Sequence, residues 1–176
     1  MPDFDRRRLC RHLLALAAGP LLPGPARARS GATEAPLLLA ETYHGHEDPA
    51  AYWVSEKLDG VRAWWDGQTL FFCSGRPIAA PAWFLAGLPQ RAVDGELWLG
   101  RGRFDALSAI VRRQQPVDAE WRQVRYLLFE LPGAPGTFSE RLVQLQSLAA
   151  VGDHPGWEVL EQFRVADRGA LQQRLA

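Results

Sequence analysis

The strongest constraint on the fold is a pair of apolar runs joined by an Asp-Gly step. Residues 61–65 and 69–73 are rich in Val, Trp, Phe and other strand formers, and Asp66-Gly67 lies between them. Such a step between apolar runs predicts a β-hairpin, because glycine reaches the positive φ that tight hairpin turns require. The preceding run, 52–57, predicts a further strand that ends at Lys57. Lys57 is therefore expected at the edge of an antiparallel sheet.

The chain has 176 residues, 47% of them hydrophobic, which suffices for one domain with a buried core. Its first 28 residues do not fit that domain. Four arginines between residues 6 and 11 precede an apolar run, 13–22, and Ala26-Arg27-Ala28 follows as a small-x-small site. This pattern predicts a signal peptide at 1–28, of the Sec or the twin-arginine type. The apolar run is too short for a membrane anchor, so we expect an exported, periplasmic protein.

Without residues 1–28 the chain carries 15 basic and 18 acidic residues. This balance excludes a bulk polycation, so any contact with nucleic acid must come from a local patch. Cys73 is then the one remaining cysteine, which excludes an intramolecular disulfide and a cysteine-based metal site. A loop with His44, His46, Glu47 and Asp48 is more typical of a solvated turn than of a metal site.

Lys57 stands out because it is the only lysine among 20 basic residues. Arginine stays protonated in proteins, whereas a lysine amine can lose its proton and then act as a nucleophile. The alternative is a single surface lysine in an arginine-rich composition. Lys57 also begins the pattern Lys-x-Asp-Gly-x-Arg, in which Gly60 permits close backbone approach and Arg62 can direct a positive charge at a phosphate.

The segment 56–62, EKLDGVR, resembles the nucleotidyl-lysine motif of the covalent nucleotidyltransferases. This family comprises ATP-dependent DNA ligases, RNA ligases and messenger-RNA capping enzymes. The resemblance implies that Lys57 attacks the α-phosphate of a nucleoside triphosphate and holds the nucleotide through a phosphoramidate bond. It further implies that Glu56 and Arg62 help to bind ATP.

Three further residues take their expected roles from this resemblance. The run 94–98, DGELW, places two carboxylates in an apolar strand, which is costly unless they have partners. It resembles the family's third motif, which implies that Glu96 holds the ribose and helps to place a divalent cation such as Mg²⁺. Phe129 matches the aromatic that stacks on adenine, and Arg76 matches a residue that reaches the sugar and the DNA backbone. Without the resemblance, an exposed turn, a core aromatic and a surface arginine would explain the same residues.

Residues 101–125 contain six arginines and three acids, which suits a phosphate backbone but also a solvated helix face. The stretch 100–113, GRGRFDALSAIVRR, resembles small bacterial exported ATP-dependent DNA ligases. That resemblance implies a monomeric enzyme that seals nicks in double-stranded DNA, through a lysyl-AMP intermediate, in DNA replication, repair or recombination.

The resemblance covers residues 36–175 but only the first part of a nucleotidyltransferase. A second metal-binding glutamate, a lysine pair and the OB-fold domain have no counterpart in the printed sequence. We therefore expect residues 29–176 to form a partial adenylation domain that does not seal nicks by itself. Two alternatives remain open, namely an RNA ligase or capping-type enzyme, and an inactive nucleotide- or DNA-binding remnant.

The expected fold class is α+β, with antiparallel sheets and packed helices. Further strands are predicted at 91–99, 124–131 and 157–165. A short helix is expected after Pro81, with Trp83 and Phe84 in the core. Other helices are predicted from 104 to 113, after a capping box at 137–140, and from 170 to 176 with Asp167 as its cap.

Overall fold

The computed structural model describes residues 37, 42–151 and 155–175. The chain divides into two units, residues 1–31 and 32–176, and all described residues lie in the second. The predicted signal peptide at 1–28 therefore lies outside the described residues. Within the described ranges, no helix has the length and apolar character needed to cross a membrane.

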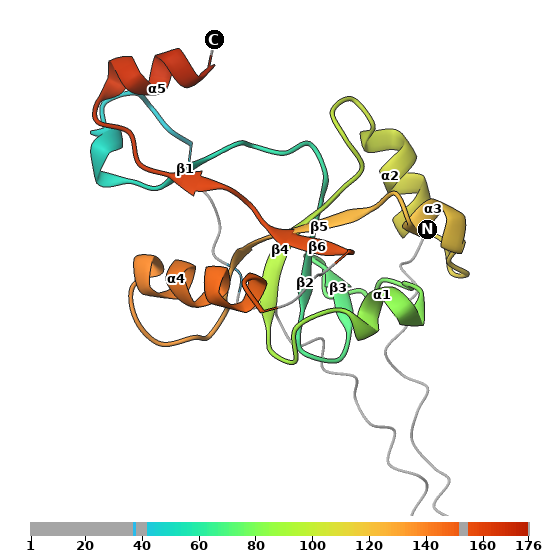
Figure 1. Ribbon diagram of the computed structural model, residues 1–176. Coiled ribbons are helices and arrows are strands. Elements are labelled where there is room, and N and C mark those ends of the chain that lie inside the picture. Colours follow the sequence, from blue (N-terminus) through green and yellow to red (C-terminus); the bar gives the residue numbers. More distant parts are fainter. Residues whose placement is uncertain (1–36, 38–41, 152–154, 176) are drawn as a thin grey trace, which may run out of the picture. The chain divides into compact units, whose positions relative to one another are not determined.

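A five-stranded sheet forms the centre of the fold (Figure 1). Its order is β3-β2-β4-β5-β6. The strands span Val61–Trp65 (β2), Leu70–Phe72 (β3), Val93–Trp98 (β4), Arg125–Glu130 (β5) and Trp157–Val159 (β6). Neighbouring strands run antiparallel except β5 and β6, which are parallel. The chain segment that connects β5 to β6 contains a helix, as crossover connections between parallel strands commonly do. The predicted α+β class is confirmed, with this parallel pair at one edge.

The predicted hairpin is confirmed as β2–β3. Asp66 closes its turn, because the Oδ1 atom accepts hydrogen bonds from the backbone N–H groups of Gln68 at 2.7 Å and Thr69 at 2.6 Å. Gly67 has a φ of 103°, a conformation that side chains with a Cβ rarely adopt. Local turn chemistry thus fixes where β2 ends and β3 begins.

A second, two-stranded sheet pairs β1 (Val54–Ser55) with β7 (Gln162–Phe163). The prediction of one strand over 157–165 is wrong, because this stretch splits into β6 and β7. After β6 the Leu160 N–H still bonds to the Leu128 carbonyl at 2.8 Å, and the chain then leaves the large sheet to pair with β1. The predicted strand 52–57 is also shorter than expected, so Lys57 lies in the loop after β1.

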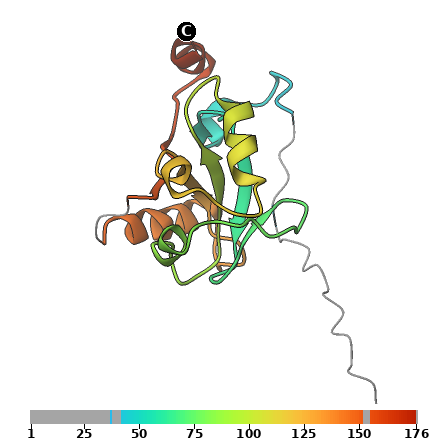
Figure 2. The ribbon, with the colours of Figure 1, turned by 90° about the vertical axis from the view of Figure 1, so that its right-hand side faces the viewer.

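Each of the helices α1–α4, whose arrangement is seen in Figure 1 and Figure 2, contributes side chains to the hydrophobic core. Their bounds are Ala82–Ala86 (α1), Phe104–Val111 (α2), Asp118–Trp121 (α3) and Phe138–Ala149 (α4), and Arg168–Leu175 forms α5. A short 3₁₀ helix, η1, spans Pro49–Ala51. The capping box of α4 is present as predicted. The four-residue α3 and the three-residue η1 were not predicted, since neither is long enough to show a helical period.

One core prediction is wrong. Phe84 is buried at 2% exposure, but its neighbour Trp83 is 38% exposed and lies under the guanidinium of Arg122 at 5.4 Å. Adjacent residues of a helix point in different directions, so a five-residue helix can bury only one of two neighbouring aromatics here.

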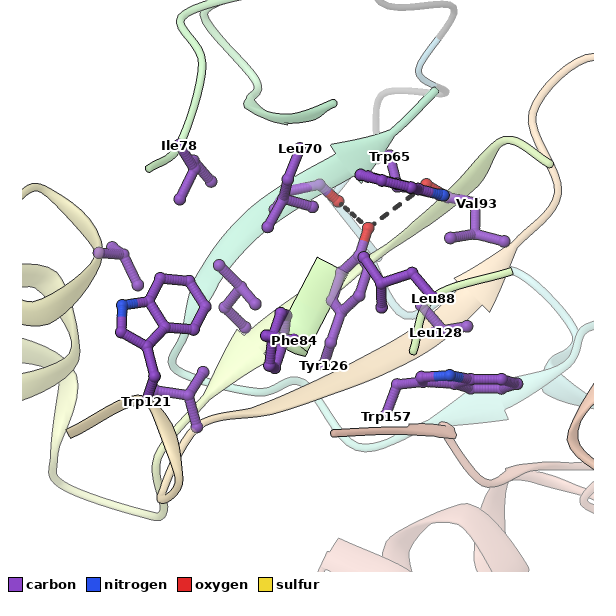
Figure 3. Close-up of a cluster of buried hydrophobic side chains, with 14 of the residues drawn as sticks. Trp65, Leu70, Ile78, Phe84, Leu88, Val93, Trp121, Tyr126, Leu128 and Trp157 are labelled. Atoms are coloured by element: carbon purple, nitrogen blue, oxygen red, sulfur yellow. Dashed lines mark hydrogen bonds between the residues drawn. The ribbon is translucent and has the colours of Figure 1, made fainter. Parts of the chain in front are cut away.

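Tyr126 holds the core face of the sheet together (Figure 3). Its side chain is fully buried, and its hydroxyl reaches the carbonyl of Ala63 on β2 at 2.8 Å and that of Val93 on β4 at 3.3 Å. Trp65, Phe84 and Trp157 belong to the same cluster. Because a β5 side chain bonds to both β2 and β4, it fixes the relative positions of these three strands on the core face of the sheet.

Candidate active site

A cavity of about 470 Å³ brings together residues from both sheets. It is lined by the end of β1 and the following loop, by β2, β4 and β5, and by residues before and within β7. Side chains alternate along a strand, so Val93 and Leu97 enter the core while Asp94 and Glu96 face the cavity. Five of the six predicted site residues line this one cavity: Glu56, Lys57, Arg62, Glu96 and Phe129.

Gly60 positions the loop that carries Lys57. Its N–H donates to Glu96 Oε1 at 3.1 Å. A Cβ at Gly60 would clash with the carbonyl of Leu97 and would lie 2.6 Å from Glu96 Cγ. The glycine therefore permits the loop to lie directly against β4, which places Lys57 near Glu96. The Lys57 side chain is exposed, and among the described residues none forms a hydrogen bond or an ion pair with its amine.

Glu96 is partly buried beside this loop. Burial raises the pKa of the Glu96 carboxyl, although the Gly60 N–H and the positive charges of Lys57 and Arg62 oppose the increase. The carboxyl thus has a fixed orientation through one oxygen. Its environment favours partners that supply positive charge or hydrogen-bond donors.

Arg62 and Asp94 form a buried ion pair across β2 and β4. Arg62 Nε donates to Asp94 Oδ1 at 3.2 Å and Arg62 Nη2 donates to Oδ2 at 2.7 Å. Asp94 is 1% exposed, and burial raises its pKa while the two hydrogen bonds from Arg62 oppose that shift. The possible exposed turn at Asp94-Gly95 is therefore wrong, and the expectation that these acids need partners is confirmed. Asp94 fixes Arg62 in the direction of the cavity.

Phe129 lies at an irregularity of β5. Asp94 is paired with Glu130 and the next residue, Gly95, with Leu128, so Phe129 is the extra residue of a β-bulge. Its ring lies 5.6 Å from the guanidinium carbon of Arg62. Its carbonyl accepts a hydrogen bond from Gln162 Nε2 at 3.1 Å. Bulges redirect side chains, and this one presents an aromatic face to the cavity.

A second buried ion pair supports the β5 side of the cavity. Arg141 on α4 donates to both carboxylate oxygens of Glu130, at 2.8 and 2.7 Å. Burial acts to raise the pKa of Glu130, but the hydrogen bonds from Arg141 and from the Leu131 N–H together lower it below its ordinary value. Arg141 also lies 5.9 Å from the ring of Phe138, a second aromatic in the cavity. The pair therefore fixes α4 against β5.

Arg76 does not reach this cavity. It is exposed on the loop after β3, lies 4.8 Å from the ring centre of Phe72, and lines a separate cavity with Arg112 and Arg113. A different arginine contacts the mouth of the larger cavity, since Arg101 Nη2 pairs with Glu56 Oε1 at 2.7 Å. Sequence reasoning included Arg101 only in a basic stretch.

The residues present suit a divalent cation only in part. Among the described residues, no group of three or more His, Cys, Asp and Glu side chains could hold a metal ion. Mg²⁺ is commonly bound by one or two carboxylates together with substrate phosphates and water. Glu96 fits the role of a single carboxylate ligand, provided that the phosphates of a nucleotide supply further ligands.

Comparison with known proteins identifies relatives of this chain. No protein-family model matches it. A DNA ligase of Haemophilus influenzae is 37% identical over 143 residues, which make up 80% of this chain and 51% of that ligase. A solved structure of a Lig E DNA ligase superposes with a TM-score of 0.72 at 40% identity, covering 79% of this chain and 55% of that one.

More distant structures support the fold alone. The solved structure named Pmar-Lig_PreS3 matches with a TM-score of 0.55 at 16% identity, over 70% of this chain and 34% of that chain. This chain thus spans about half the length of the ligases that it matches above 30% identity. By sequence identity and by fold, the chain is thus similar to about half of a bacterial DNA ligase.

Proposed function

We propose that the cavity binds ATP and that Lys57 becomes adenylylated, as the first step in sealing nicks in DNA. The observation that carries this proposal is the convergence of Lys57, Glu96 and Phe129 on one cavity from three separate segments of the chain. An amine, a carboxylate and an aromatic face match the three parts of the nucleotide: the α-phosphate, the ribose and the base.

The covalent step needs few protein groups. The unprotonated amine of Lys57 attacks the α-phosphorus, a P–N bond forms, and the bond from the α-phosphorus to the bridging oxygen breaks. Pyrophosphate leaves, and the amine loses a proton to solvent. Arg62, which the Asp94 carboxylate holds in place, contributes a fixed positive charge toward the phosphate. A bound Mg²⁺ would neutralise negative charge on the triphosphate.

Transfer of AMP to a 5′-phosphate and attack by a 3′-hydroxyl would complete the reaction of a ligase. We propose nicked double-stranded DNA as the substrate, because the relatives are DNA ligases. Arg76, Arg112 and Arg113, which line one small cavity, are candidates for contact with its backbone. Export directed by residues 1–28 remains a proposal that rests on the sequence pattern.

Labelling with radioactive ATP tests this function. With Mg²⁺ and ATP labelled at the α-phosphate, the label should become attached to the protein in an acid-labile form. Lys57→Arg should abolish the labelling, because arginine keeps the charge but supplies no nucleophilic amine. A nicked duplex added to the same reaction reports separately whether this chain carries the reaction beyond adenylylation.

The matched control restores a lysine at another place. The double variant Lys57→Arg, Arg122→Lys has the same number of lysines as the original chain, but Arg122 lies on the surface after α3. It should remain unlabelled. Labelling that survives Lys57→Arg, or a preference for GTP over ATP, would contradict the proposal.

A further inference from the structure

We infer that the side-chain amide of Gln162 selects adenine over guanine in the cavity, an inference that rests on the proposed nucleotide-binding function. Gln162 lies on β7 directly opposite Ser55 of β1, two residues before Lys57. Both Gln162 and Phe129 line the cavity. The amide therefore lies between the strand that leads to Lys57 and the aromatic face proposed to stack on the base.

The β-bulge fixes which end of the amide faces the protein. Gln162 Nε2 donates to the carbonyl oxygen of Phe129 at 3.1 Å. A backbone carbonyl only accepts hydrogen bonds, so the amide oxygen of Gln162 cannot take this place without repulsion. Phe129 is the residue without a partner on β4, and a regular ladder would not leave this carbonyl to a side chain. The orientation of the amide thus follows from the irregularity of β5.

The remaining groups of the amide match one purine. Within the part of the chain that the structure describes, the bond to Phe129 is the one hydrogen bond of the Gln162 side chain, which leaves Oε1 and a second N–H for a ligand. Adenine presents its N6 amine as a donor beside a ring-nitrogen acceptor, the pattern that glutamine recognises by two hydrogen bonds. Gln162 Oε1 can therefore accept from N6.

Guanine presents the opposite pattern. Its O6 atom is an acceptor and would face Gln162 Oε1 without a hydrogen between them. Rotating the amide to offer its nitrogen to O6 would turn Oε1 toward the carbonyl of Phe129 and break the bond that holds the side chain. Either arrangement leaves two acceptors in contact in a partly buried site, which is unfavourable. Discrimination therefore depends on Phe129 as well as on Gln162.

A structural role for this hydrogen bond would have a different consequence. The bond also connects β7 to β5, so its loss could lower stability and weaken the binding of every nucleotide equally. A role in base recognition instead changes the ratio of affinities for two nucleotides that differ only in the base. That ratio is the quantity to measure.

The experiment compares equilibrium binding of ATP, ITP and GTP to the full 176-residue chain in the presence of Mg²⁺. ITP carries an oxygen in place of the N6 amine, so it tests the proposed contact directly. The original chain should bind ATP roughly 10- to 100-fold more tightly than ITP or GTP. Gln162→Met, which keeps a long unbranched side chain but has no amide, should lose most of this ratio.

Gln146→Met is the matched control, because Gln146 is exposed on α4 and does not line the cavity. It should keep the preference for ATP. Gln162→Leu, which also has no hydrogen-bonding group, decides the question if Gln162→Met does not fold. Equal affinity of the original chain for ATP and ITP, or an unchanged ratio in the folded Gln162 variants, would overturn the inference. Failure of the original chain to bind any of the three nucleotides would instead overturn the proposed function of the cavity.

Discussion

Replacing Asp94 by leucine should destabilise the protein strongly, whereas replacing both Asp94 and Arg62 should cost much less. Asp94 is 1% exposed, and the Arg62 side chain is 26% exposed. Removal of one member of a buried ion pair typically costs about 3 to 5 kcal/mol, because the other charge stays buried without its partner. Since Arg62 keeps some contact with solvent, we expect Asp94→Leu to lower the free energy of unfolding by about 3 kcal/mol, at the low end of this range.

The double variant, Asp94→Leu with Arg62→Met, removes both charges. Burial raises the pKa of Asp94 even with Arg62 present, so the pair does not fully compensate the cost of burying the carboxylate. Apolar side chains of similar size should therefore recover about half or more of the loss, as replacement of a whole buried pair often does. The coupling energy of the double-mutant cycle should then exceed roughly 1 kcal/mol in magnitude.

Urea unfolding followed by tryptophan fluorescence measures these differences, because the chain has seven tryptophans. The matched control is Glu158→Leu, which removes an exposed pair with Arg125 in the same sheet, 3.3 Å apart. It should change stability by no more than about 1 kcal/mol. If Asp94→Leu costs no more than this control, or if the double variant costs the sum of the two single variants, the buried pair does not act as we have reasoned.

Three further predictions concern the loop and the carboxyls of the cavity. Gly60→Ala should lower the free energy of unfolding by about 1 to 3 kcal/mol and weaken ATP binding, because the added Cβ would clash with β4. In the control Gly87→Ala, the nearest contact of the added Cβ would be 3.6 Å, so neither stability in thermal melts nor affinity in ATP titrations should change. Burial raises the pKa of Glu96, so as the pH falls, Mg²⁺-dependent ATP binding should begin to weaken at a higher pH than it would with an ordinary glutamate. The Glu96→Gln variant should bind ATP less tightly, and its affinity should not show this pH dependence in titrations across the mildly acidic range. The pKa of Glu130 is lowered in the folded state, so its stabilising contribution is complete above the ordinary glutamate pKa and is lost as the pH falls through the lowered value. Glu130→Gln should therefore lower the free energy of unfolding by about 3 kcal/mol at neutral pH. A difference in stability between this variant and the original chain that persists at low pH would contradict the prediction.

Sequence reasoning predicted which residues line the cavity better than it predicted the contacts that hold them. Lys57, Glu96 and Phe129 are recognisable because each occurs in a short motif with an unusual composition, such as two acids in an apolar strand. The partner of Arg62 was harder to predict. Asp94 lies 32 residues away, and only the register of β2 against β4 brings the two side chains together.

Other features left little signal in the sequence. Gln162 is one polar residue in a stretch that predicts a single strand, and its role depends on the division of that stretch into β6 and β7. The bulge at Phe129 arises from pairing with β4 and not from a local pattern. Arg76 satisfied the local expectation of an exposed loop arginine, but its position relative to the cavity depends on how far the chain turns after β3.

The tripeptide Asp94-Gly95-Glu96 shows why the core and the cavity cannot vary independently. Its two acids face the cavity, while Gly95 faces the core, where a Cβ would lie 2.8 Å from the Tyr126 ring. The absence of a side chain lets Tyr126 pass beneath β4 and bond to the carbonyl of Val93. The same bond network sets the spacing of β2 and β4, and this spacing determines whether Arg62 can reach Asp94. An acid-Gly-acid sequence in a strand therefore serves both faces of the sheet, with the glycine positioning the strand and the acids positioning the charges.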